Sequence, residues 1–140
     1  MRAIVQRVSE ASASVEGEEV GAIGPGLLVL LGVKAGDGEG NAERMAAKLE
    51  KLRIFEDAEG KMNLDVRQAE GEVLVISQFT VYGDTRKGNR PSYTEAAAPE
   101  VADTLYQLVV ERLEAKAGTF GAHMHVTLTN DGPVTLIVET

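Results

Sequence analysis

The chain has no cysteine among its 140 residues. This absence excludes a disulfide framework, thiolate ligands for zinc and a cysteine nucleophile. Any catalysis must therefore use other chemical groups. A chain of this length can bury one hydrophobic core without covalent staples, so we expect a single domain over residues 1–140.

Long apolar runs are missing as well. The longest candidate, residues 27–33, is far shorter than the roughly 20 residues that a membrane helix needs. Met1 leads directly into an alternating apolar and polar segment, without the charged and then apolar stretch of a secretory leader. We therefore expect a soluble, cytoplasmic protein that does not enter a membrane.

Basic residues are in the minority, because 14 lysines and arginines face 22 acidic residues and the net charge is −8. A general nucleic-acid binder needs a basic surface, so any RNA contact must be local. Basic residues gather in residues 85–91, which include Arg86, Lys87 and Arg90, and again at Lys48, Lys51 and Arg53. Ordinary solvated charge is the simpler interpretation of both groups.

The hydrophobic pattern predicts strands and two helices. Strands are indicated for residues 2–15, 18–23, 26–33, 73–76, 124–129 and 134–138, and residues 73–76 are apolar on both faces like a central strand. Asn41 is a candidate N-cap for a helix whose apolar face ends at Leu52. A second helix is predicted to begin at Pro99 and to end before Gly118.

Strands that precede, separate and follow two helices predict one three-layer α/β domain. In this fold both helices cover one face of a curved, mixed, barrel-like sheet. The opposite face must also be covered, by a second β layer or by a partner subunit.

The segment Ser77, Gln78, Phe79 and Thr80 places three polar side chains where the most apolar strand ends. Ligands tend to bind at the carboxyl ends of strands in α/β sheets, which makes this segment a candidate site. A strand that simply runs out into a polar turn explains the same residues equally well. The residues alone leave both interpretations open.

Other patterns favour structural interpretations. Residues 130–135 have the composition of a hairpin turn. His123 and His125 would share one face of a strand, but no third metal ligand is visible, so we expect no metal and favour solvent-facing histidines. The G-x-S-x-G elbow of many serine hydrolases is missing, and the glycines at 36, 38 and 40 lack the lysine of a phosphate-binding loop.

The chain nevertheless resembles the D-aminoacyl-tRNA deacylases over essentially its whole length. The resemblance is carried by residues 1–8, 52–57, 60–63, 77–80, 88–92, 120–122 and 130–135, which occur in the family's order. The pairing of Ser-Gln-Phe-Thr with Gly-Pro-Val-Thr is its most specific part. Val81 and Gly83 depart from the leucine and alanine common in the family, and neither position carries out chemistry.

The resemblance implies a homodimer that hydrolyses the ester between tRNA and a D-amino acid or glycine, needs no cofactor and rejects L-aminoacyl-tRNA. The active sites would lie at the subunit interface, which would cover the open sheet face. The pocket for the aminoacyl group and the terminal adenosine would be lined by Ser77, Gln78, Phe79 and Thr80.

The remaining site residues also follow from the resemblance. Gly132 and Pro133 of the other subunit would form a cis peptide that screens chirality, because a glycine backbone can approach the substrate's α-carbon closely. Arg7 resembles the residue that steadies this loop. Arg86, Lys87 and Arg90 become candidates for contact with the tRNA backbone.

Two mechanisms are compatible with these residues. Thr80 could attack the ester, but a threonine hydroxyl needs an adjacent base and the sequence offers none. Alternatively, backbone N–H groups around Phe79 stabilise the oxyanion while the substrate's 2′-hydroxyl assists a water, which we favour. The rival functions are a non-catalytic module that binds the acceptor end of tRNA and an unrelated esterase for small molecules.

Overall fold

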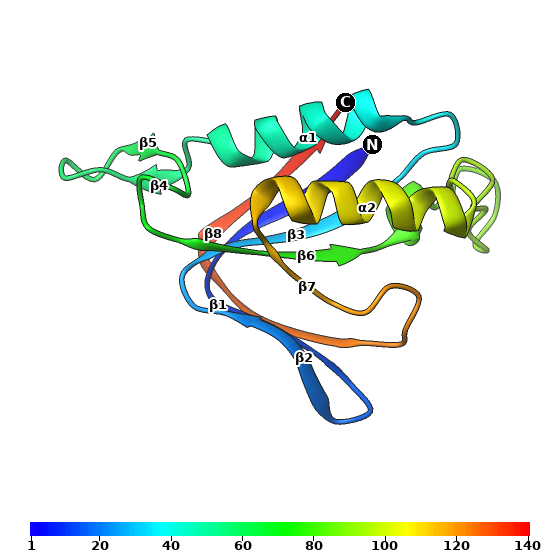
Figure 1. The fold of residues 1–140 in the computed structure, drawn as a ribbon, viewed down its shortest axis with the longest axis horizontal. Helices are drawn as coiled ribbons and strands as arrows, with labels where there is room; N and C mark the ends of the chain where they lie inside the picture. The colour runs from blue at the N-terminus through cyan, green and yellow to red at the C-terminus, as the bar shows by residue number, and fades with distance from the viewer.

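The longest N-terminal strand organises the sheet. In a computed structural model that describes residues 1–140, β1 (Arg2–Val15) pairs antiparallel with β8 (His125–Glu139) along one edge (Figure 1). Its other edge pairs first with β3 (Gly26–Gly32) and then with β2 (Glu18–Ile23). β1 bends along its length, so its first half pairs with β3 and its second half with β2. The sheet therefore curls.

The centre of the sheet is parallel. β3 pairs with β6 (Glu72–Ser77), and β6 pairs with β7 (Lys116–Ala117), which gives the order β2-β1-β3-β6-β7 with β8 on β1. Residues 73–76 are all buried, which confirms the predicted central strand. β7 was not predicted, because a strand of two residues has no periodicity to detect.

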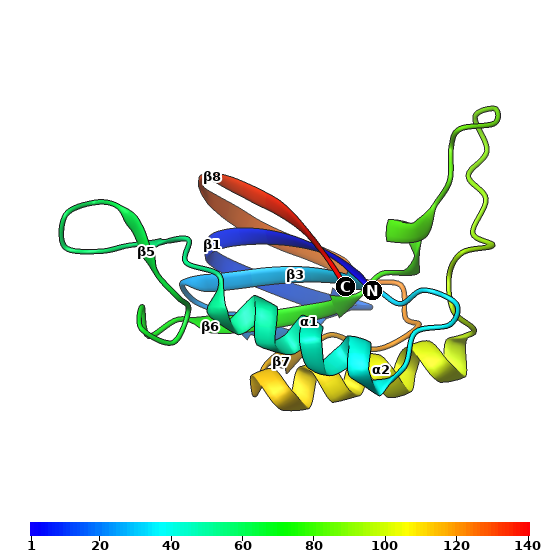
Figure 2. The same ribbon diagram turned by 90° about the horizontal axis from the view of Figure 1, so that it is seen from above.

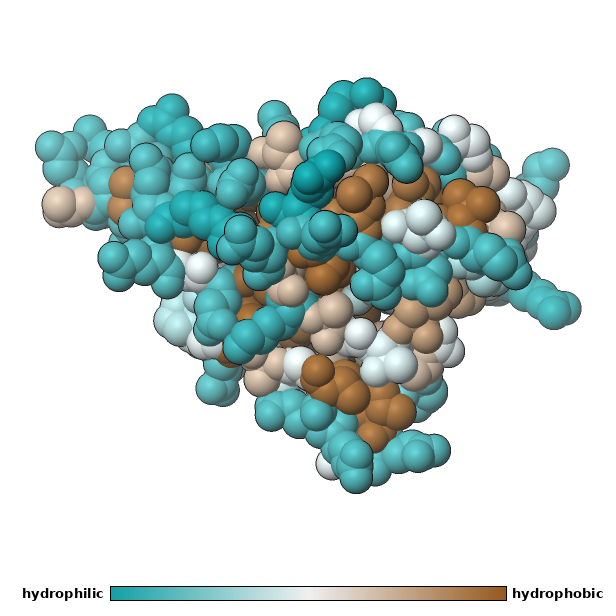
Figure 3. Space-filling view, viewed as in Figure 1, coloured by the Kyte–Doolittle hydropathy of each residue, from teal (hydrophilic) through white to brown (hydrophobic).

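Both helices lie on one face of this sheet, as predicted (Figure 2). α1 (Glu39–Lys51) and α2 (Pro99–Leu113) turn their apolar stripes inward, and polar side chains cover the outer surface of α1 (Figure 3). Buried Tyr106 donates a hydrogen bond of 2.8 Å to the carbonyl oxygen of Val75, which ties α2 to the central strand. Burial raises the pKa of Tyr106 to about 12.

Two apolar cores lie on the two sides of the sheet. One fills the space between the sheet and the helices. The other lies inside the curl and contains Val8, Ala11, Ala13, Ile23, Leu28, Leu74 and Ile76. The curl brings β2 so close to β7 that a Cβ at Gly21 would lie 2.6 Å from the carbonyl oxygen of Ala117. The three-layer, barrel-like prediction is thus confirmed, and a β layer of the same chain covers much of the second face.

Helix α2 begins at Pro99, as predicted, but one end of each helix differs from the prediction. The N-cap of α1 is Gly38 instead of Asn41, and the side chain of Asn41 accepts a 3.0 Å hydrogen bond from the Gly38 backbone N–H. Helix α2 ends at Leu113, and its C-cap residue Glu114 adopts the left-handed conformation that glycine usually occupies. Gly118 has a packing role, since a Cβ there would lie 2.6 Å from Met124 Sδ.

The predicted hairpin turn at residues 130–135 is wrong. β8 is one continuous strand whose two halves both pair with β1, and the register shifts between Gln6 and Val8 leave residues 131–134 without a partner. Residues 131–134 form a bulge within β8 instead of a turn. The reason is that β1 is long enough to pair with β8 on both sides of the bulge.

The remaining elements are short. β4 (Phe55–Glu56) and β5 (Met62–Leu64) form a small separate hairpin, and η1 (Phe79–Tyr82) is a single turn of 3₁₀ helix directly after β6. None of the helices is long and apolar enough to span a membrane.

Candidate functional site

A large cavity opens at the carboxyl ends of the parallel strands β3 and β6. It has a volume of about 870 Å³, and 15 of its 21 lining residues are hydrophobic. The chain leaves β6 after Ser77 and turns at once into η1, which packs on β3 at Gly32. A Cβ at Gly32 would lie 3.0 Å from the Tyr82 ring, so glycine permits this close approach.

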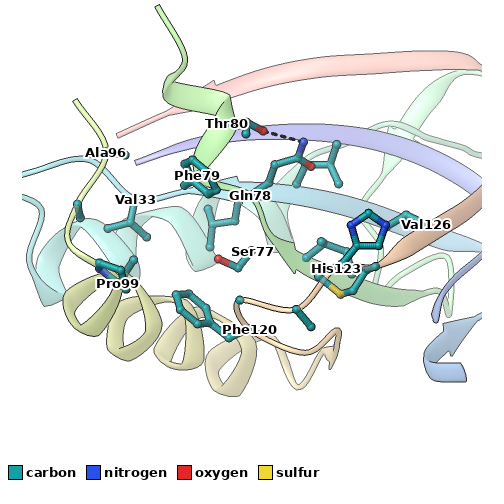
Figure 4. A pocket seen from close by; sticks show the side chains of 18 of the residues that line it. Val33, Ser77, Gln78, Phe79, Thr80, Ala96, Pro99, Phe120, His123 and Val126 are labelled. Carbon is teal, nitrogen blue, oxygen red and sulfur yellow. Dashed lines mark hydrogen bonds between the residues drawn. The ribbon is translucent and has the colours of Figure 1, made fainter. Parts of the chain in front are cut away.

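The four residues of the Ser-Gln-Phe-Thr segment all line this cavity. The side-chain amide of Gln78 donates a 3.0 Å hydrogen bond to the Thr80 hydroxyl oxygen, and Figure 4 shows Ser77 between Phe79 and Phe120. Phe79 is 57% exposed, which is unusual for a phenylalanine. Of the two interpretations of this segment, the cavity favours a binding site over a simple turn.

Several lining residues were not selected as site residues from the sequence. They come from the loop before α2, from α2 itself and from the loop before β8, and they include Tyr93, Ala97, Ala102, Phe120, Gly121, Ala122 and Met124. The scarcity of aromatic residues was an available signal. The chain has three phenylalanines and three tyrosines, and Phe79, Tyr93 and Phe120 all line the cavity.

Gly132 and Pro133 do not lie in this cavity. Their peptide bond is cis, as expected, and both residues are exposed on the bulge of β8. Within one chain, the structure therefore does not bring the Gly-Pro peptide to residues 77–80.

Two side chains hold this bulge in place. Arg7 is only 7% exposed, and it donates hydrogen bonds of 2.9 Å to the Asp131 carbonyl and of 2.7 Å to the Ile54 carbonyl. The Asn130 side chain accepts a 2.8 Å hydrogen bond from the Val134 N–H, an interaction that the sequence did not reveal. The bulge is thus braced from both sides.

One of the two histidines, His123, lines the cavity (Figure 4). His125 is the first residue of β8, and the ring centroids of the two histidines are 5.3 Å apart. Both side chains are exposed. No third histidine, cysteine or carboxylate joins them in a group that could hold a metal ion.

The basic loop lies on an arm, residues 83–95, that extends away from the sheet (Figure 2). Asp84 and Ser92 pair at its base through backbone hydrogen bonds of 2.8 and 2.9 Å. Arg86 forms an ion pair of 2.7 Å with Asp84, which lowers the pKa of that carboxyl group to about 2. Lys87 and Arg90 are exposed and have no ion pair.

Comparisons with known proteins match this chain over its whole length. A family model described as D-Tyr-tRNA(Tyr) deacylase matches residues 4–139. A D-aminoacyl-tRNA deacylase of Heliobacterium modesticaldum is 56% identical across 99% of this chain and 96% of that protein. A protein of the same name from Thermotoga petrophila is also 56% identical, across 100% of this chain and 97% of that protein.

Solved structures share the fold. A structure described as "c-Myc DNA Unwinding Element Binding Protein" superposes with a TM-score of 0.95 at 41% identity and covers 100% of this chain and 99% of that chain. A probable eukaryotic D-amino acid tRNA deacylase superposes with a TM-score of 0.86, and at 16% identity it supports the fold alone. Because the family model covers nearly every residue and relatives of the same length are more than half identical, this chain belongs to the D-Tyr-tRNA(Tyr) deacylase family.

Proposed function

We propose that this chain hydrolyses the ester bond of D-aminoacyl-tRNA, including glycyl-tRNA, and releases the amino acid and the tRNA, while it rejects L-aminoacyl-tRNA. The observation that carries the proposal is membership of the family from residue 4 to residue 139. The cavity at residues 77–80 gives the reaction a place in the fold, because it combines an apolar wall with a few polar groups at one end.

The chemistry of the cavity favours a reaction without a protein nucleophile. The hydrogen-bond partner of the Thr80 hydroxyl is the side-chain amide of Gln78, and a neutral amide cannot take up a proton. Without a base, the Thr80 hydroxyl is a weak nucleophile at neutral pH. We therefore assign Gln78 and Thr80 to substrate binding.

The proposed reaction needs only water and the substrate's own ribose. Water adds to the ester carbonyl carbon with assistance from the neighbouring 2′-hydroxyl, the bond to the 3′-oxygen breaks, and that oxygen takes up a proton. Phe79 and Thr80 are the first residues of a 3₁₀ helix, and their backbone N–H groups have no acceptor within that helix. These groups would stabilise the oxyanion, together with the positioning that the cavity provides.

A second copy of the chain would complete the site as a homodimer. The Gly-Pro bulge is exposed and braced by Arg7, yet it does not line the cavity of its own chain. The outer edge of β8 has no partner strand, and Ile137 on this strand is 68% exposed. Long unpaired edges with apolar side chains favour association with another chain.

In the dimer, the partner's bulge would supply the chiral screen. Gly132 has no Cβ, so its backbone can approach the substrate's α-carbon more closely than any other residue's. An L side chain would collide with this backbone, whereas hydrogen would fit. Glycine is therefore expected to be a substrate.

One set of incubations separates the possible functions. Purified protein is incubated with D-tyrosyl-tRNA, with uncharged tRNA and with D-tyrosine ethyl ester. A deacylase releases D-tyrosine from the tRNA much faster than from the ethyl ester. A binding module retains both tRNAs without hydrolysis, and a general esterase prefers the ethyl ester, so either result would contradict the proposal.

A further inference from the structure

An exposed aromatic pair lies at the cavity. The rings of Phe79 and Tyr93 meet edge to face with their centroids 5.0 Å apart, and both residues line the cavity. Phe79 is 57% exposed and Tyr93 is 39% exposed. Two aromatic rings kept partly in solvent, beside an apolar cavity, are poorly explained by the stability of the fold alone.

Tyr93 is the one tyrosine of the chain that is exposed. Tyr106 is buried and donates a hydrogen bond to Val75, and Tyr82 is buried beneath Arg2 with the guanidinium 4.8 Å from its ring centroid. The Tyr93 hydroxyl makes no hydrogen bond within the chain, so the ring is placed by packing.

The backbone around Tyr93 holds this ring in place. A Cβ at Gly83 would lie 3.0 Å from Tyr93 Cε1, so the ring packs directly on the glycine backbone. On another side it meets Phe79. The ring is thus held between the base of the arm and η1, with one part left open to solvent.

The arm that carries Tyr93 also carries positive charge without acidic partners. Arg86 is neutralised by Asp84, but Lys87 and Arg90 are exposed and unpaired. Aromatic rings next to unpaired cations are typical of sites that bind single-stranded nucleic acid, where bases stack on the rings and phosphates meet the cations. The 3′ end of an aminoacyl-tRNA is single-stranded and ends at the ester.

We propose that Tyr93 is a substrate-positioning residue that stacks on an unpaired base of the tRNA 3′ end, while the ester lies at residues 77–80. The inference rests on the proposed function and adds to it how the site distinguishes tRNA from a simple ester. Lys87 and Arg90 then meet phosphates of the same single strand.

The kinetic test uses Tyr93→Ala, Tyr93→Phe and the control Val20→Ala, which truncates a side chain of matching exposure on β2. Stacking on a base stabilises the bound tRNA, so Tyr93→Ala should raise KM for D-tyrosyl-tRNA between about 5-fold and 100-fold, with a much smaller change in kcat. The loss of kcat/KM on D-tyrosine ethyl ester should be at least about fivefold smaller than the loss on D-tyrosyl-tRNA. Tyr93→Phe and Val20→Ala should behave like the wild type.

A spectroscopic test does not depend on catalysis. The chain has no tryptophan, and Tyr82 and Tyr106 are buried, so Tyr93 is the tyrosine open to a ligand. The trinucleotide CCA should quench tyrosine fluorescence in the wild type. Tyr93→Phe should bind labelled CCA with similar affinity but lose the quenching, and Tyr93→Ala should lose both.

The outcomes distinguish the two proposals. If the wild type does not hydrolyse D-tyrosyl-tRNA, the proposed function is wrong, and the quenching test still decides whether Tyr93 contacts a base. If the wild type is active but Tyr93→Ala leaves KM unchanged, or loses equal activity on tRNA and ethyl ester, the role of Tyr93 is wrong. Quenching that persists in Tyr93→Phe would also overturn it.

Discussion

At the scale of single residues, the hydroxyl of Thr80 tests the mechanism. Its partner is the Gln78 amide, which cannot act as a base. We therefore predict that Thr80→Ala retains measurable hydrolysis of D-tyrosyl-tRNA, within about tenfold of the wild type, a reduction on the scale of one hydrogen bond. Replacing the terminal ribose of the tRNA by its 2′-deoxy form should slow the reaction far more. Single-turnover rates measure both, and complete inactivity of Thr80→Ala with ligand binding intact would favour Thr80 as the nucleophile.

Apart from the family resemblance, the sequence predicted individual site residues where a local pattern carried the signal. Ser77 to Thr80 stood out because polar side chains followed an apolar strand, and these residues do line the cavity. Tyr93 and Asn130 did not stand out, since their interactions join segments that are distant in sequence or bulged out of a strand. The hydrogen bond from Arg7 to Asp131 spans 124 positions, and the role of Arg7 came from the family resemblance alone.

At the scale of elements, Tyr106 links α2 to β6. Its hydroxyl is the partner of the Val75 carbonyl, so Tyr106→Phe leaves that buried oxygen without this donor and should cost about 1–2 kcal/mol of folding stability. Burial holds the pKa of Tyr106 at about 12 in the folded chain, against about 10 when unfolded. A raised pKa contributes stability that is complete below about pH 10 and diminishes as the pH rises towards 12.

Denaturant unfolding between about pH 7 and about pH 11.5 measures both effects. The free energy of unfolding of the wild type should fall above about pH 10. That of Tyr106→Phe should be lower at neutral pH and should fall less over the same pH range. Tyr82 has a pKa raised to about 12 by burial as well, so part of the alkaline effect should remain in the variant. Identical slopes above about pH 10 in both proteins would show that the Tyr106 hydroxyl is not buried as described.

The arm at residues 83–95 is the second element with a testable role. Lys87 and Arg90 lack ion-pair partners within the chain. The double variant Lys87→Ala with Arg90→Ala should therefore reduce the slope of log tRNA affinity against log salt concentration by about 1.4. This change is about 0.7 for each phosphate that is no longer neutralised. Arg86 is already neutralised by Asp84. The net-neutral change Asp84→Asn with Arg86→Gln should therefore leave the slope unchanged, and an equal effect of the two double variants would contradict this division of roles.

The bounds of helices and strands were predictable where the turn or cap residues and the hydrophobic periodicity indicate the same position. Where these two signals disagree, the bounds were not predictable. The strands at residues 2–15 and 18–23 match the structure because their alternation is clear and the turn at Gly17 separates them. Helix α2 begins at Pro99, as predicted, but one end of each helix differs, because Gly38 caps α1 in place of the expected Asn41 and Glu114 caps α2 in place of the expected Gly118. The last strand was predicted as two because its bulge has a turn-like composition, while its continuity depends on pairing with distant β1.

At the scale of the whole molecule, a site shared between two chains predicts complementation. A Cβ at Gly132 would lie 2.8 Å from the Val134 backbone nitrogen, at a φ of +145° that other residues rarely adopt, so Gly132→Ala should distort the bulge. Ala122→Phe should fill the cavity of its own chain. Each homodimer is expected to be inactive.

Mixing the two variants under subunit exchange restores one complete site in each mixed dimer. With equal amounts of the two variants, half of the dimers are mixed, and one of the two sites in each mixed dimer is intact. About a quarter of the wild-type activity should therefore return. Activity that stays at the level of the separate variants, with mixed dimers confirmed by mass spectrometry, would place both parts of the site in one chain.

Chiral selection is the central claim, and one comparison tests it directly. The kcat/KM of the purified wild-type chain is measured on D-tyrosyl-tRNA and on L-tyrosyl-tRNA prepared from the same tRNA. A backbone that collides with an L side chain should separate the two values by a factor on the order of 100 or more, which corresponds to at least about 2.7 kcal/mol. Equal values for the two substrates would contradict the account.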